Sequence, residues 1–104
     1  MLYQLGSLIQ PVGLYPNPFT DKSVLMFNLR VQAQVEVTIF NVAGEVVDGF
    51  VVNGQASPPV NSAVWEGINR FGARCASGIY PVHVKAHGVD GTNGDYWVTL
   101  ACVR

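Results

Sequence analysis

Charged side chains are scarce in this sequence. Asp, Glu, Lys and Arg together make up 12% of its 104 residues, about half of the share in an average globular domain. The six basic and seven acidic residues are scattered along the chain, so no basic face is available to collect phosphate groups. The composition therefore predicts no nucleic-acid binding. With 49% apolar residues, the chain is also too hydrophobic to be disordered and should fold as one domain.

Long hydrophobic runs are also missing. No apolar stretch reaches the ~18 residues that a membrane-spanning helix needs, so membrane insertion is not expected. The N-terminus MLYQLGSLIQPVG lacks the basic start and the small-residue cleavage motif of a signal peptide. If the protein is exported, we expect its signal upstream of Met1, and the chain would then be a piece of a longer protein.

Cysteine is rare, and the two cysteines belong to no recognisable motif. Neither Cys75 nor Cys102 lies in a C-x-x-C pair or a Cys/His cluster, so we expect no zinc site, no redox motif and no cofactor. An even pair permits one disulfide without requiring it. A Cys75–Cys102 bridge and two separate thiols both stay open.

Helical periodicity is absent, whereas period-two alternation recurs along the chain. The alternation predicts strands within SVLMFNL, VEVTIFN, EVVDGFVV, SAVWEG, IYPVHVKAH and YWVTLACVR. Gly44 should turn the second of these into the third, and Gly91 and Gly94 should turn the chain before the last. We therefore predict an all-β antiparallel sandwich of six or seven strands. The residues expected to face inward are Leu25, Phe27, Leu29, Val35, Val37, Ile39, Tyr80, Val82, Val84, Ala86, Val98, Leu100 and Cys102.

Few residues suggest a metal-binding or catalytic site. His83 and His87 would lie ~13 Å apart on one strand and could not share a metal ion; a solvated face is expected, with a pH-dependent partner contact as the alternative. The DGTNGD segment, Asp90 to Asp95, is interpreted as a hairpin turn, with a calcium loop as the alternative. Cys75 could pair with a histidine as a catalytic dyad, but no nucleophile motif surrounds it, so we predict no enzyme.

Two large aromatic side chains are expected on outward faces. Alternation places Phe40 and Trp97 there, and exposed aromatic residues favour contact with a partner. Pairing of the last two strands should put Trp97 across from Lys85, which would allow a cation–π contact, and Cys102 across from about Tyr80. Pro81 removes one backbone donor and should lie at a sheet edge, at a bulge or where its nitrogen points away from a paired strand.

Three segments together resemble a known group of domains. GLYPNPFTDKSVLMFNL, VEVTIFNVAGEVV and VWEGINRFGARCASGIYPVHVKA occur in an order and spacing similar to the immunoglobulin-like domain of flagellar hook-capping proteins and the C-terminal sorting domains of the type IX secretion system. Glu66, Cys75 and Pro81 depart from that pattern. The residues that carry the resemblance are Tyr15, Pro16, Asn17, Pro18, Phe19, Phe40, Asn41, Gly44, Trp65, Gly67, Asn69, Gly72, Ala76, Ser77, Gly78 and Tyr80.

The resemblance implies an immunoglobulin or fibronectin-III-like β-sandwich of about seven strands without catalytic residues. Residues 13–104 would form this domain, preceded by an arm or first strand over residues 1–12. The implied role is sorting or surface attachment of a secreted or cell-surface bacterial protein through a protein partner. A self-assembling or cap subunit of an extracellular appendage is the alternative, and a carbohydrate-binding accessory domain that uses Trp97 is a weaker one.

The glycine-rich segment between Trp65 and Tyr80 could be an active-site loop or a structural turn. We interpret it as structural. Trp65 should plug the core at the end of a strand, and Gly67, Gly72 and Gly78 should adopt backbone conformations that other residues resist.

Overall fold

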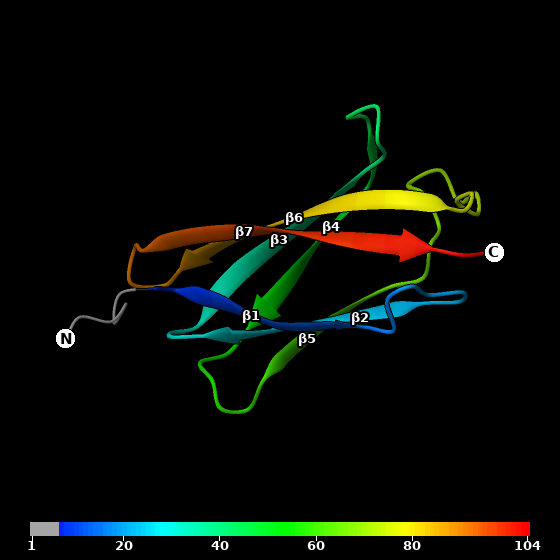
Figure 1. The fold of residues 1–104 in the computed structure, drawn as a ribbon. Helices are drawn as coiled ribbons and strands as arrows, with labels where there is room; N and C mark the ends of the chain where they lie inside the picture. The colour runs from blue at the N-terminus through cyan, green and yellow to red at the C-terminus, as the bar shows by residue number, and fades with distance from the viewer. Residues whose placement is uncertain (1–6) are drawn as a thin grey trace.

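The chain folds into two stacked antiparallel sheets in a computed structural model that describes residues 7–104. Figure 1 shows the layers, with the C-terminus at the same end as the β5–β6 connection. One sheet has the order β1-β2-β5, and the other has the order β4-β3-β6-β7. The strands are β1 (Ile9–Tyr15), β2 (Ser23–Leu29), β3 (Ala33–Phe40), β4 (Val46–Gly54), β5 (Asn61–Trp65), β6 (Gly78–Gly88) and β7 (Asn93–Cys102).

The predicted all-β sandwich is confirmed, with seven strands. Alternate side chains of β2, β3 and β6 enter the space between the sheets, because successive residues of a strand point to opposite faces. The buried core contains nearly all the residues expected to face inward, and only Val98 is partly exposed. Residues 7–104 form no helix that is long and apolar enough to span a membrane.

The N-terminal boundary is less simple than expected. Strand β1 starts at Ile9 and runs across the proposed division between residues 12 and 13. Its ladder with β2 is irregular between Pro11 and Gly13. The expected N-terminal arm falls partly on residues 1–6, which lie outside the described residues.

Two of the connections contain a glycine in a backbone conformation that other residues avoid. Gly44 and Gly91 have φ of 83° and 86° in the β3–β4 and β6–β7 connections, the left-handed region that glycine enters without penalty. Pro81 lies where predicted. The β3–β6 ladder ends at the Ile39–Val82 pair, so β3 offers no hydrogen-bond acceptor at Pro81, which has no N–H to donate.

Candidate functional site

Most residues of the resemblance meet at one end of the sandwich, which we call the C-terminal pole. It comprises the β1–β2 connection (residues 16–22), the β5–β6 connection (residues 66–77) and the end of the chain (residues 101–104). These segments are far apart in sequence and adjacent in Figure 1. The pole is therefore the place to look for function.

The first segment of the pole caps the free edge of β7. Asn17 Nδ2 donates to the Thr99 carbonyl at 3.0 Å, and Asn17 Oδ1 accepts from the Ala101 N–H at 2.9 Å. The Phe19 N–H then bonds to the Ala101 carbonyl at 2.9 Å, and the Val103 N–H bonds to the Phe19 carbonyl at 2.8 Å. The Tyr-Pro-Asn-Pro-Phe motif thus covers the edge of β7 with the Asn17 side chain and with a single parallel bridge between Phe19 and Cys102.

Three aromatic rings fill the core beneath this cap. Trp65 is 6% exposed, and its ring centroid lies 5.7 Å from that of Phe19 and 5.5 Å from that of Tyr80. The indole N–H donates to Asp48 Oδ2 and to the Ile68 carbonyl at 3.0 and 3.1 Å, as a buried Trp requires. Trp65 is the predicted core plug; sequence reasoning missed its partner Asp48.

Two Asn-x-x-Gly turns are built alike. Asn69 Oδ1 accepts from the N–H groups of Phe71 and Ala73, each at 2.9 Å, and the Gly72 N–H bonds to the Asn69 carbonyl. Asn41 does the same for Ala43, Glu45 and Gly44 at the β3–β4 turn. Such side-chain bonds replace a backbone turn locally, so both asparagines have a structural role.

Arg104 closes the pole from the end of the chain. Its guanidinium donates to the carbonyls of Thr20, Gly67 and Cys75, and it lies 5.8 Å over the Phe19 ring. Gly67 has φ 70°, and a Cβ there would overlap Arg104 Nη2 and crowd the Phe19 ring, so the Arg104 guanidinium would have to move. The sequence predicted an unusual conformation at Gly67 and missed this close approach by Arg104.

Gly78 corrects the expectation for the third glycine. It is the first residue of β6 and has no positive φ. A methyl group at this position would have Tyr80 as its nearest neighbour, at an ordinary 3.9 Å. Gly72, by contrast, has φ 86° as expected. The turn ends before Gly78, so the strand conformation there suits other residues too.

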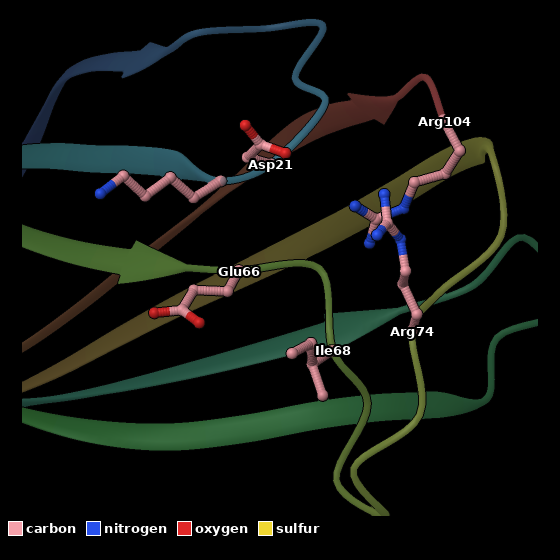
Figure 2. Close-up of a pocket in the computed structure, with 6 residues that line it drawn as sticks. Asp21, Glu66, Ile68, Arg74 and Arg104 are labelled. Atoms are coloured by element: carbon pink, nitrogen blue, oxygen red, sulfur yellow. The ribbon is translucent and has the colours of Figure 1, made fainter.

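The surface of the pole has a shallow, charged depression of about 440 Å³. Figure 2 shows the side chains of Arg74 and Arg104 pointing toward one another across it, with Asp21 and Glu66 on the neighbouring segments. Arg104 already binds three carbonyls. Residues 7–104 contain no group of three or more His, Cys, Asp or Glu side chains arranged to hold a metal ion.

Both cysteines are buried free thiols, so the permitted bridge is not formed in this structure. Cys102 pairs with Gly78 and not, as expected, with Tyr80, because the β6–β7 register is two residues from the predicted one. Burial raises the pKa of the Cys75 thiol, and the Arg104 charge offsets only part of that rise. A thiol with a raised pKa is a poorer nucleophile.

The proposed dyad of Cys75 with a histidine does not form. Cys75 is buried in the core, whereas His83 and His87 occupy the outward face of β6 and bond there to Asp95 at 2.8 Å and to Glu36 at 3.1 Å.

Asp90 turns the chain after β6, and its hydrogen bonds from Thr92 and the nearby Arg30 lower the pKa of its carboxyl. Asp90 thus bonds within a hairpin, the interpretation that the sequence favoured.

The two outward aromatic residues, Phe40 and Trp97, lie next to each other, but the residue across the ladder from Trp97 is not the expected one. Trp97 is 57% exposed and stacks on His83, with ring centroids 4.6 Å apart, and it lies 5.5 Å from Phe40. Lys85 faces Asp95 across the ladder, so the predicted Lys85–Trp97 pair is wrong. Ladder pairing continues to His87 and Asn93, which makes the connection shorter than the sequence suggested.

The family model for the secretion system C-terminal sorting domain matches residues 13–94. The chain belongs to this family. No curated protein sequence matches this sorting domain closely enough to count as a relative.

Two solved structures have a similar fold. Dimeric latent PorU from Porphyromonas gingivalis superposes on the sorting domain with a TM-score of 0.75 at 18% identity, over 89% of this chain and 9% of PorU. FlgD from Xanthomonas campestris, a protein described as essential for flagellar assembly through hook capping, gives 0.67 at 19% identity, over 90% of this chain and 67% of FlgD. The sorting domain thus spans less than a tenth of PorU, and both likenesses concern the fold alone.

Proposed function

We propose that this chain is a non-catalytic module that directs a protein joined to it to the bacterial cell surface or the medium, and that the secretion machinery recognises it as a folded domain. The observation that carries the proposal is the family match over residues 13–94. The proposed partner contact is the outward aromatic pair of Phe40 and Trp97.

The chemistry of the pole supports a structural use of its motif residues. The polar groups of the motif residues bond within the domain: those of Asn17, Asn69 and Arg104 bond to the backbone, and the Trp65 indole N–H also bonds to the half-buried Asp48. Side chains bound in this way hold loops in place and are not free to act on a substrate. The motif therefore maintains a shape, and that shape is what we propose a partner recognises.

A fusion experiment tests the proposal. A reporter enzyme that carries an N-terminal export signal is joined to the N-terminus of this chain and produced in a bacterium that has a type IX secretion system. We expect reporter activity in the medium or on intact cells, whereas the reporter alone should stay inside. The matched control joins the reporter to the corresponding domain of FlgD, which has the same fold. Equal export of both fusions, or retention of both, would contradict a specific sorting role.

Self-assembly is the second candidate function. It is favoured by the exposed apolar side chains on the outer strands, among them Val51 and Trp97, which are 54% and 57% exposed. Light scattering on the isolated domain should then show oligomers that grow with concentration, and a monomer at high concentration would exclude it. The carbohydrate-binding alternative stays a prediction that rests on Trp97, to be tested by comparing polysaccharide retention of Trp97→Ala and the unaltered domain.

A further inference from the structure

The free edge of β7 is divided into a capped and an open half. In an antiparallel ladder, the N–H and C=O groups of every second residue point away from the paired strand. On β7 these include Thr99 and Ala101, because the Thr99 carbonyl and both Ala101 groups bond to the β1–β2 connection. The same alternation assigns outward groups to Asn93, Asp95 and Trp97.

The half of the edge toward the start of β7 has no such cap. Within residues 7–104, no hydrogen bond reaches the outward backbone groups of Asn93, Asp95 or Trp97, and all three side chains are exposed. Strand β1 approaches β7 without pairing with it. A run of unpaired backbone groups on an exposed edge is a template for an added strand.

The side chains beside this open edge indicate which strand would fit. Trp97 presents apolar surface on the outer face, next to Phe40 and His83. Asp95 lies two residues away on the same face and bonds to His83 Nε2 at 2.8 Å. Side chains directly opposite each other on neighbouring strands interact. A matching strand therefore needs an apolar residue beside Trp97 and a basic residue beside Asp95.

We propose that the open edge of β7, from Asn93 to Trp97, binds an extended segment of another protein as an added antiparallel strand. That segment has a large apolar residue opposite Trp97 and a lysine or arginine opposite Asp95. The inference goes beyond the proposed function, because it assigns a peptide-binding edge whatever protein the domain is joined to.

A second copy of this chain fits the edge less well. The symmetrical antiparallel pairing that uses only the open residues sets Asn93 against Trp97 and Asp95 against its own copy. Like charges directly opposite each other destabilise a ladder. A pairing shifted toward the end of β7 would meet Asn17 and Phe19, which already occupy that part of the edge. The charge pattern thus favours a different protein with a basic residue.

A synthetic peptide of sequence Thr-Val-Thr-Phe-Thr-Lys-Thr-Val-Thr tests this inference, because it sets Phe opposite Trp97 when Lys is opposite Asp95. Amide chemical shifts and hydrogen exchange are recorded by NMR on the whole domain during titration to millimolar peptide. We expect the amides of Asp95 and Trp97 to shift and to exchange more slowly, with those of β4, the opposite edge, unchanged.

Two variants distinguish the contribution of the Asp95 backbone N–H to peptide binding from that of its side chain. Asp95→Pro removes one outward N–H and leaves the ladder with β6 intact, so it should weaken binding at least about tenfold, whereas Asp95→Ala keeps the N–H and should weaken it less. If Asp95→Pro does not fold, Trp97→Ala is compared with Val51→Ala, an apolar residue of similar exposure on β4. Only Trp97→Ala should weaken binding.

Four results would overturn the inference. They are the absence of any shift at millimolar peptide, shifts confined to β4, equal weakening by Trp97→Ala and Val51→Ala, and amides of Asp95 and Trp97 that are already protected without peptide. In the last case the edge is filled by another copy or by the chain itself, and dilution distinguishes these two.

Discussion

Two tyrosine hydroxyls of the large sheet differ in what they contact. Tyr80 is buried and donates to the Ala76 carbonyl at 2.6 Å. The Tyr96 hydroxyl is also shielded from solvent, but none of residues 7–104 accepts from it or donates to it. A buried polar group without a partner costs free energy that a paired one does not. The same side chain should therefore contribute differently to stability at these two positions.

Replacing each tyrosine by phenylalanine tests this difference. Tyr96→Phe should raise the free energy of unfolding by about 1 kcal/mol, since it removes an unpaired hydroxyl, and Tyr80→Phe should lower it by about 1 kcal/mol, since it leaves a carbonyl unpaired. Denaturant unfolding at neutral pH measures both. A loss of stability in Tyr96→Phe equal to that in Tyr80→Phe would show that the Tyr96 hydroxyl has a partner.

The pH dependence provides a second measure on the same variant. Burial raises the pKa of Tyr96 from 10.0 to about 12, so the folded domain holds this proton more tightly than the unfolded chain does. The corresponding stability is complete below pH 10 and is lost as the pH rises toward 12. Tyr96→Phe should therefore lose less stability than the unaltered domain between pH 10 and 12, and an identical loss would contradict the assignment.

At the scale of the element, the alternation of apolar residues predicts which face of the sheet a side chain occupies, whereas only the pairing of strands decides which residue lies opposite it. Period two placed Val35 and Val37 inward and Phe40 outward, and all three are found so. It could not fix which residues pair. Trp97 faces His83 and not Lys85, and because the error is two residues, every side chain keeps its face.

The pole shows a second limit of the sequence. Glycine and asparagine turns could be located from neighbouring residues, because they are closed by bonds within a few positions. Asn17 bonds to residues 82 and 84 positions away, and Arg104 spans a similar separation to Thr20. No local pattern indicates contacts of this range, so the motif was visible while its role as an edge cap was not.

The cap on β7 leads to a prediction about a single amide. Asn17→Ala removes both hydrogen bonds of the side chain, so the Ala101 N–H should exchange with solvent at least about tenfold faster, corresponding to about 1.4 kcal/mol of lost protection. Asn28→Ala is the control, because Asn28 is exposed on β2 and its side chain makes no hydrogen bond within residues 7–104. Unchanged exchange at Ala101 would mean that Phe19 alone holds the edge.

At the scale of the whole molecule, the two ends of the sandwich differ. The pole is closed by contacts among segments from the start, middle and end of the chain, with Arg104 joined to two connections. The opposite half of β7 keeps an open edge within the described part of the chain. One end is thus fixed in shape and the other retains unpaired backbone, which is the arrangement expected of a module that presents a strand edge to a partner.

Opening of the pole can be followed through its own thiols. Cys75 and Cys102 are buried at the pole, and the Cys75 carbonyl accepts a hydrogen bond from Arg104, so an alkylating reagent reaches the two thiols only when the pole opens. Arg104→Ala removes three hydrogen bonds from a charged donor and should cost about 2 kcal/mol of local stability, which raises the alkylation rate of both thiols at least about tenfold.

Arg104→Lys should recover little, because an ammonium lacks the fork that reaches several carbonyls. Arg70→Ala is the control, since the Arg70 guanidinium lies over the exposed Phe71 ring. If Arg104→Ala left both rates unchanged while amide exchange in β3 also stayed constant, the pole would be held by its aromatic core and not by the end of the chain.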